Sequence, residues 1–264
     1  MSVGEGSRAS NAIFHGNFPD WNSACNASEI HQVNQDGINP TTAYDSDRWL
    51  DRQRNFLKEA KVGHTPRPTN LPLLAASVGA GSILDLGGGS GWTSELLFRE
   101  KNQITRYVVF ELPRVCQEFQ REFGNDSGIS FSGSVEDISK SEIRNLDILY
   151  CNSALQYFPD NTTINNLTSI LYPKWVLLDD FITSSNMTFF SLQYYYGSYI
   201  PYRFTSLRDI EKTFSELGYE LIVKSEAHSP ISSSWEMKIE GDHKFESNIG
   251  PSFNLLFRRI ASSN

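Results

Sequence analysis

Cysteine is scarce in this chain: its 264 residues include three, Cys25, Cys116 and Cys151. No two of them have the spacing of metal ligands, so we expect no metal site, and the odd thiol suits a reducing compartment. The opening residues, MSVGEGSRAS, lack the charged-then-apolar pattern of a signal peptide, and no apolar run approaches transmembrane length. We therefore expect a cytoplasmic protein without an integral membrane segment.

Blocks of basic residues are also missing. The chain has 23 Lys and Arg against 31 Asp and Glu, which gives a net charge of −8. Nucleic acids are normally bound by a basic patch, so we expect no nucleic-acid partner. The length suits one α/β domain with an N-terminal extension and is too short for two full domains.

The most informative stretch that is present is Ser82-Ile-Leu-Asp-Leu-Gly-Gly-Gly-Ser-Gly-Trp92. A strand-like apolar run enters a glycine-rich loop and a helical pattern follows, as at the nucleotide-binding turn of an open α/β sheet. Trp92 or Ser94 stands where the dinucleotide motif Gly-x-Gly-x-x-Gly needs its third glycine, which disfavours a nicotinamide oxidoreductase. The loop instead fits acid-x-Gly-x-Gly-x-Gly, with Asp85, Gly87, Gly89 and Gly91.

This pattern resembles the first motif of the class I S-adenosylmethionine-dependent methyltransferases. About 20 residues after the last glycine, the apolar run Tyr107-Val-Val-Phe ends in Glu111, where a ribose-binding acid is expected. Residues 146–160 resemble the fourth strand and post-strand motif of the same superfamily. The resemblance implies a Rossmann-like, seven-stranded sheet with helices on both faces and an antiparallel last strand.

Apolar strands alternate with helical patterns from Ser82 onward, which independently predicts an α/β fold with a mostly parallel sheet. The expected strands are 82–86, 106–111, 128–132, 146–151, 174–179, 219–225 and 252–260, and the expected helices are 91–100, 114–123, 138–144, 161–170 and 206–217. Before them we expect an amphipathic helix over 46–62 and a helix over 71–78 capped by Thr69. We expect residues 1–68 to form an N-terminal extension and helical lid, and residues 69–264 the Rossmann-like domain, with an acceptor-binding insertion at about 184–205 and a polar excursion from about 227 to 250.

The resemblance implies S-adenosylmethionine as the cofactor. It assigns Asp85 and the glycines to the methionine end and Glu111 to the ribose. Ser134 stands where an acid usually holds the adenine, so that contact falls to its hydroxyl or to the Val135 amide. The cofactor residues implied in this way are Asp85, Gly87, Gly88, Gly89, Glu111, Leu112, Ser134, Val135, Asn152 and Ser153, the last two beneath the sulfonium.

The sequence identifies a general base less clearly than it identifies the cofactor residues. Many small-molecule O-methyltransferases have a histidine in the post-strand segment, where this chain has Gln156 and Tyr157, neither of them a base at neutral pH. Asp179 and Asp180 end a strand at the ligand-binding edge, and adjacent side chains point to opposite faces, so at most one enters the site. We take Asp180, Tyr157 and Gln156 as the catalytic candidates. Four histidines are weaker alternatives: His15, His64, His228 and His243.

The tyrosine-rich residues 189–204 are the clearest acceptor-side feature. Tyrosines can stack on sugar rings and bond their hydroxyls, and Arg203 can clamp a phosphate or carboxylate. We expect Phe189, Phe190 and Phe204 in the core, and assign acceptor binding to Gln193, Tyr199, Tyr202 and Arg203.

Three stretches resemble a narrower, little-characterised bacterial methyltransferase family often encoded near polysaccharide-biosynthesis genes: residues 14–21, 152–157 and 193–203. This resemblance implies O-methylation of a sugar or glycan precursor. The alternatives are N- or O-methylation of a small secondary metabolite, and a non-catalytic, cofactor-binding interaction module. The sequence leaves the oligomeric state open, a homodimer included.

Overall fold

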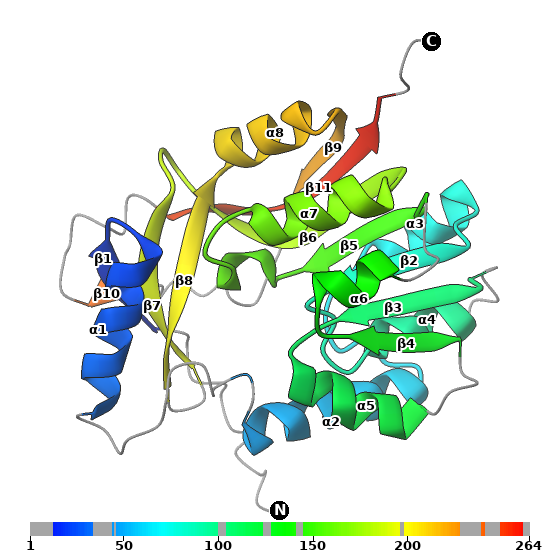
Figure 1. Cartoon of the computed structure of the whole chain (residues 1–264), viewed down its shortest axis with the longest axis horizontal. Coiled ribbons are helices and arrows are strands. Elements are labelled where there is room, and N and C mark those ends of the chain that lie inside the picture. Colours follow the sequence, from blue (N-terminus) through cyan, green and yellow to red (C-terminus); the bar gives the residue numbers. More distant parts are fainter. Residues whose placement is uncertain are drawn as a thin grey trace, which may run out of the picture.

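A computed structural model describes residues 13–33, 44, 46–99, 104–123, 128–140, 145–195, 198–227, 239–240 and 249–260. They form one large sheet with helices on both faces (Figure 1). In chain order the elements are β1 (Ile13–Phe18), α1 (Trp21–Val33), α2 (Asp47–Lys61), α3 (Leu71–Val78), β2 (Ser82–Leu86), α4 (Trp92–Arg99), β3 (Arg106–Phe110), α5 (Pro113–Phe123), β4 (Ile129–Ser132), α6 (Val135–Lys140), β5 (Ile148–Asn152), a 3₁₀ turn (Leu155–Tyr157), α7 (Thr162–Leu171), β6 (Trp175–Ser184), β7 (Phe189–Tyr195), β8 (Ser198–Ser206), α8 (Leu207–Glu216), β9 (Tyr219–Glu226), β10 (Ile239–Glu240) and β11 (Ile249–Arg259).

The central part of the sheet has the predicted arrangement. Strands β4, β3, β2, β5 and β6 lie side by side in that order and run parallel. Strand β11 lies between β6 and β9 and is antiparallel to both. The predicted Rossmann-like α/β fold with an antiparallel last strand is therefore confirmed.

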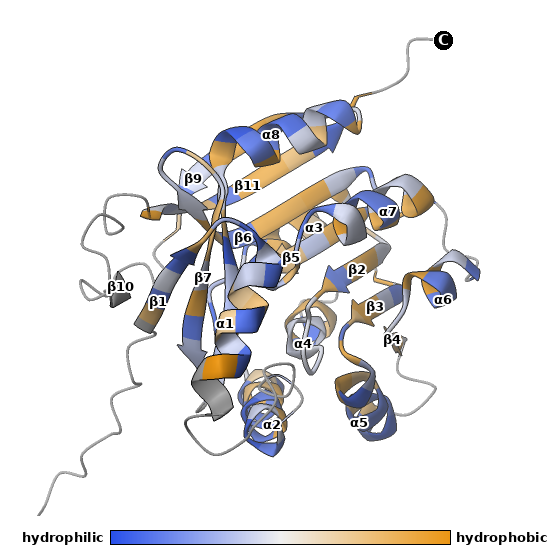
Figure 2. Cartoon of the chain, turned by 60° about the vertical axis from the view of Figure 1, so that its left-hand side comes forward, coloured by the Kyte–Doolittle hydropathy of each residue, from blue (hydrophilic) through white to orange (hydrophobic). Residues whose placement is uncertain are grey.

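Alternate residues of the parallel strands face opposite sides of the sheet, as the pleat requires. Leu84 and Val108 pack in the core beneath α6, α7 and α8, whereas Ile83 and Tyr107 pack beneath α3 and α4. Figure 2 shows the consequence: the central strands are largely hydrophobic, while α5 and α8 carry hydrophilic residues beside hydrophobic ones. Burial on both faces explains why these strands are continuous apolar runs in the sequence.

Side-chain caps decide where several helices begin. Ser46 accepts the Trp49 N–H at 3.2 Å ahead of α2. The predicted helix 138–144 instead begins at Val135, because the Ser134 hydroxyl accepts the Asp137 N–H at 3.1 Å and closes the first turn. The residue at the N-cap of α3 is Asn70 rather than the predicted Thr69, although Thr69 Oγ1 accepts the Leu71 N–H at 3.1 Å.

Beyond β6 the sheet continues into four strands that the sequence analysis did not predict. β7 and β8 form an antiparallel hairpin, β1 pairs with β7, and β10 pairs with β1. Strand β6 extends to Ser184, past its predicted end at 179, because its last residues pair with both β8 and β11. Helix α1 packs on β8, so the N-terminal part supplies a strand as well as helices (Figure 1).

Helix α2 lies against α4 and α5, where Leu50, Leu57 and Trp92 share one apolar cluster. None of the described helices is both long enough and apolar enough to cross a membrane. His228, His243 and most of the predicted polar excursion lie outside the described residues.

Candidate functional site

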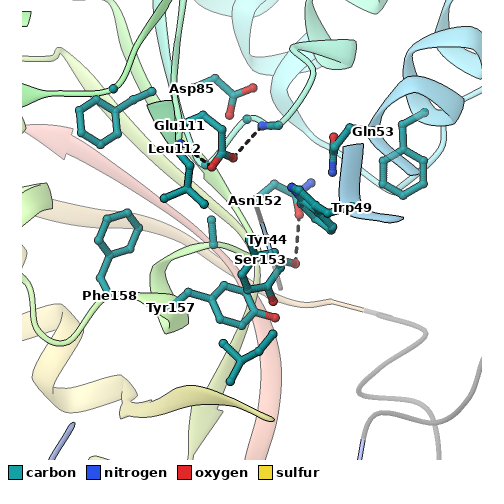
Figure 3. Close-up of a pocket in the computed structure, with 18 of the residues that line it drawn as sticks. Tyr44, Trp49, Gln53, Asp85, Glu111, Leu112, Asn152, Ser153, Tyr157 and Phe158 are labelled. Atoms are coloured by element: carbon teal, nitrogen blue, oxygen red, sulfur yellow. Dashed lines mark hydrogen bonds between the residues drawn. The ribbon is translucent and has the colours of Figure 1, made fainter. Parts of the chain in front are cut away.

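A cavity of about 430 Å³ opens at the carboxyl ends of β2, β3 and β5. Parallel α/β sheets bind ligands at this edge. Residues of helices α1 and α2 and of strand β8 also line the cavity. Figure 3 shows Trp49 and Gln53 of α2 with Asp85, Glu111 and Asn152 around the cavity. The lining residues used below are Tyr44, Trp49, Gln53, Arg67, Asp85, Gly87, Gly88, Gly89, Glu111, Leu112, Asn152, Ser153, Tyr157, Ile200 and Pro201.

The glycine loop has no room for side chains. A Cβ on Gly87 would lie 2.3 Å from the Ala154 Cβ, and one on Gly89 would lie 2.2 Å from Gln53 Oε1. Both glycines also have a left-handed backbone, with φ of 73° and 57°. The loop backbone is therefore the surface that a ligand meets.

Asp85 lies directly beneath this loop. A Cβ on Gly88 would come within 2.5 Å of its carboxylate, and the Tyr107 hydroxyl donates to Asp85 Oδ2 at 2.5 Å. Burial raises the pKa of Asp85 to about 7, and the nearby Glu111 charge adds to the increase, while the Tyr107 bond opposes it. The site thus holds a carboxyl group that titrates near neutrality.

Glu111 follows β3 and turns its carboxylate back toward the glycine loop. The Gly89 N–H donates to Oε2 at 3.1 Å and the Leu112 N–H donates to Oε1 at 2.8 Å (Figure 3). Burial raises the pKa of Glu111, and these two backbone bonds lower it. Each carboxylate oxygen keeps acceptor capacity for a further donor.

Asn152 and Ser153 end β5 at the centre of the cavity. Asn152 Nδ2 donates to Pro68 O at 3.1 Å and to the Tyr150 hydroxyl at 3.0 Å, which fixes the amide. The Ser153 hydroxyl donates to Asp180 Oδ2 at 2.8 Å and also lies 3.2 Å from Asn152 Oδ1. Both residues line the cavity.

The two adjacent acids at 179 and 180 have different partners. Asp179 is buried and accepts the Asn70 N–H at 2.7 Å and Asn70 Nδ2 at 2.8 Å, so it anchors the start of α3. Asp180 lies behind Ser153, outside the lining of the cavity, and also accepts the Ser252 hydroxyl at 2.7 Å. Any action of Asp180 on a ligand therefore passes through Ser153.

Of the other two catalytic candidates, only Tyr157 lines the cavity. Its hydroxyl donates to Gln193 Oε1 at 2.8 Å, and burial raises its pKa. Gln156 is buried behind it and donates to Ser153 O at 2.7 Å. Gln156 thus holds the backbone of Ser153 in place, contrary to the expectation that it lines the site.

The acceptor residues expected from the tyrosine-rich segment do not line the cavity. Tyr202 packs on Phe14, and Tyr199 packs edge to face on His15. Gln193 is fully buried, and its contact with the cavity passes through Tyr157. From this hairpin it is Ile200 and Pro201 that reach the cavity, because the rings are used to pack β8 against β1 and β7.

Arg203 is also placed elsewhere. Only 4% of it is exposed, and Nη2 donates to Asn161 Oδ1 at 2.8 Å. Burial lowers its pKa to about 10. The anion clamp expected at Arg203 is therefore absent from the cavity lining.

Two residues that were expected to bind the cofactor, and two histidines, also lie outside the lining. Ser134 and Val135 do not line the cavity, where Gly133 does, since the Ser134 hydroxyl caps α6. His15 lies on β1 and His64 is exposed. Neither histidine reaches the cavity.

The sequence did not indicate the lining residues that come from outside the Rossmann-like part: Trp21, Cys25, Glu29, Tyr44, Trp49, Gln53, Phe56 and Arg67. Gln53 Oε1 accepts the Ser90 N–H at 3.1 Å, so α2 is bonded to the glycine loop. One signal was available, because Gln53 is a polar residue on the apolar stripe of Leu50 and Leu57.

No protein-family model matches the chain, and neither does any curated protein sequence. Among solved structures, the 1,6-didemethyltoxoflavin N1-methyltransferase of Burkholderia thailandensis, with bound 1,6-didemethyltoxoflavin and S-adenosylhomocysteine, has a TM-score of 0.52 at 13% identity, covering 97% of this chain and 99% of that chain. The magnesium protoporphyrin IX methyltransferase of Synechocystis PCC 6803, with bound S-adenosylmethionine, has a TM-score of 0.47 at 12% identity, covering 89% and 91%. The strand order and the first of these likenesses show that the chain has the fold of class I S-adenosylmethionine-dependent methyltransferases.

Proposed function

We propose that the protein is an S-adenosylmethionine-dependent methyltransferase that methylates an oxygen of a small ring-shaped acceptor, such as a sugar or glycan precursor. One observation carries the transferase part. Asp85 in β2 lies against Gly88, and Glu111, directly after the neighbouring parallel strand β3, accepts the Gly89 N–H. Both acids therefore adjoin a loop that admits no side chain, and all of these residues line one cavity. The solved structure with a TM-score of 0.52 contains S-adenosylhomocysteine, which supports the same cofactor here.

The residues fit this cofactor chemically. The loop at Gly87 and Gly89 has no room for a Cβ atom. Because these residues have no side chain, a ligand can approach their backbone closely. Glu111 would accept the two ribose hydroxyls with the lone pairs that its backbone bonds leave free. Asp85 would face the cationic ammonium end, where an opposite charge favours its ionised form.

When bound, S-adenosylmethionine would supply a methyl group on a sulfonium, so alignment matters more than acid–base power. The chain supplies that alignment at the end of β5, where Asn152 is held by Pro68 and Ser153 by Asp180. An acceptor hydroxyl at Ser153 would pass its proton toward the Asp180 carboxylate through the serine hydroxyl. The walls of the acceptor end are aromatic, which suits a ring with an apolar face.

A second candidate is N-methylation of a small molecule. No histidine lies among the described residues that line the cavity. Asp180 lies behind Ser153, so a ligand would exchange a proton with it only through the Ser153 hydroxyl. A neutral nitrogen nucleophile needs no base before it attacks, so this arrangement would suit it as well as an oxygen.

Titration calorimetry tests the cofactor assignment. We expect S-adenosylmethionine and S-adenosylhomocysteine to bind and NAD not to bind. Glu111→Ala should weaken binding by about tenfold or more, because charge-assisted hydrogen bonds are worth roughly 1.5–3 kcal/mol each. Glu216→Ala, at an exposed position on α8, is the matched control and should leave the affinity unchanged.

Absence of binding to a well-folded sample would overturn the proposal. A screen of sugar nucleotides and small phenols for uptake of the radiolabelled methyl group then separates the candidates. The position of the methyl group in the product, on oxygen or on nitrogen, identifies the acceptor atom. Cofactor binding without any methyl transfer favours the non-catalytic module.

A further inference from the structure

The lining of the cavity includes a cation, Arg67, whose neighbour Pro68 is bonded to Asn152 at the end of β5. Arg67 is half-buried and makes no hydrogen bond or ion pair with any residue that the structure describes. The other charged lining residues are Asp85 and Glu111 at the cofactor end and Glu29 on α1. Its guanidinium N–H donors are therefore available to a ligand that enters the cavity.

The backbone around Arg67 is held in place. Pro66 and Pro68 flank it and restrict the chain, and the Pro68 carbonyl accepts Asn152 Nδ2 at 3.1 Å. This bond ties the arginine segment to the end of β5, beside Ser153. The backbone at Arg67 is therefore fixed beside the end of β5, and its side chain lines the same cavity as Ser153.

Aromatic rings line the cavity near this cation: burial raises the pKa of Tyr157, and the charge of Arg67 opposes that rise. The ring of Tyr44 packs edge to face on Trp49, with centroids 4.9 Å apart, and on Tyr157, with centroids 4.7 Å apart. Figure 3 shows these three rings near Asn152 and Ser153. Such faces bind flat rings through stacking and edge contacts.

We propose that the acceptor is a ring-bearing anion, a carboxylate or phosphate, and that the Arg67 guanidinium binds its acidic group while the aromatic wall of Tyr44, Trp49 and Tyr157 binds its ring. The guanidinium fork matches the two oxygens of either anion. This inference rests on the proposed function and names the class of its acceptor. The anion-binding role that was expected for Arg203 is thus assigned to Arg67, which lines the cavity.

The test uses protein saturated with S-adenosylhomocysteine, titrated with phenyl phosphate, benzoate or benzyl alcohol. Tryptophan fluorescence reports binding, since Trp49 lines the cavity. The variants are Arg67→Gln, Arg67→Lys and the control Arg48→Gln, an exposed arginine on α2. Because Arg67 makes no bond within the described protein, its replacement should leave the melting temperature unchanged.

We expect at least one of the two anions to bind the wild type, and Arg67→Gln to weaken that binding by about tenfold or more. Arg67→Lys should recover part of the loss, Arg48→Gln should lose nothing, and benzyl alcohol should not respond to Arg67. The tighter anion then identifies the acidic group. Equal anion binding by Arg67→Gln and the wild type, or no anion binding by a wild type that binds S-adenosylhomocysteine, would overturn the inference. Failure of S-adenosylhomocysteine itself to bind would instead overturn the proposed function.

Discussion

Ser153 and Asp180 share a hydrogen bond of 2.8 Å, and both residues have a left-handed backbone, with φ of 51° and 49°. For residues other than glycine this conformation costs of order 1–3 kcal/mol, so it persists only where neighbours impose it. Here Gln156 holds the Ser153 carbonyl, and the Asn254 side chain accepts the Asp180 N–H at 3.1 Å. The strained pair places a serine hydroxyl in the cavity with a carboxylate behind it.

Asp180→Asn should lower kcat for methyl transfer by about a hundredfold, because a positioned base contributes roughly 10²–10⁴-fold. Ser153→Ala should cost a similar amount, and the double variant should cost little more, since the two act as one unit. Affinity for S-adenosylhomocysteine should not change. Asp179→Asn is the matched control: it should lower the melting temperature by weakening the anchor of α3, with kcat retained. Full kcat in Asp180→Asn would remove Asp180 from the mechanism.

Asp85 should make the stability of the ligand-free protein depend on pH. Its pKa is raised from 3.8 to about 7 in the folded state, so the folded protein binds the proton more tightly than the unfolded chain does. Its stabilising contribution is complete below about pH 4 and is lost as the pH rises to about 7, a change of roughly 4 kcal/mol at most. Asp85→Asn should flatten this fall, as measured by urea unfolding at several pH values. Parallel pH curves for the two proteins would contradict the assignment.

Gly87→Ala should destabilise the fold and abolish cofactor binding, because the new Cβ would lie 2.3 Å from the Ala154 Cβ. Gly218→Ala is the matched control, since Gly218 also has a left-handed backbone but has no atom within 4 Å of its Cβ position. We expect the control to cost about 1–2 kcal/mol of unfolding free energy and Gly87→Ala to cost more. Adding Ala154→Gly should restore part of the stability, which thermal unfolding would show. No recovery would mean that the clash lies elsewhere.

Gln53→Leu should weaken binding of S-adenosylhomocysteine as well as the fold. It leaves the Ser90 N–H without its acceptor in a buried position, at a cost of about 1–3 kcal/mol. Gln120→Leu makes the same change away from the cavity, where Gln120 Oε1 accepts the Phe131 N–H at 3.1 Å. Calorimetry should find reduced affinity in Gln53→Leu alone, although both variants melt earlier. Equal affinities would show that α2 does not shape the loop.

Arg203→Met should leave stability unchanged or raise it, in contrast to most changes of a buried residue. Burial lowers the pKa of Arg203 to about 10, so the fold carries the cost of a poorly compensated charge. An apolar side chain of similar length removes that cost and fills the same space. The melting temperature checks this, and phenyl phosphate binding should be the same as in the wild type. A large fall in the affinity for phenyl phosphate would show that Arg203 takes part in binding the anion.

The part of the cavity around the glycine loop could be predicted because its residues lie in one strand–loop–helix–strand segment. Asp85, the glycines and Glu111 are brought together by local geometry and by the pairing of β2 with β3. Asn152 and Ser153 follow for the same reason, since β5 pairs with the other edge of β2. The opposite part of the cavity could not be predicted, because the hairpin residues that reach a cavity depend on where the hairpin joins the sheet. Only pairing with β1 and β6 decided that Ile200 and Pro201, and not Arg203, reach the cavity.

The sequence by itself determined the parallel sheet, the glycine loop and its two acids, since residue periodicity and short-range spacing specify them. The tertiary structure alone decided which distant residues complete the site. Gln53 and Arg67 precede the Rossmann-like strands, and they reach the cavity because α2 packs on α4 and α5 and because Pro68 is bonded to Asn152. Contacts of this kind depend on packing between elements far apart in the chain, so a local pattern can mark a residue such as Gln53 without identifying its partner.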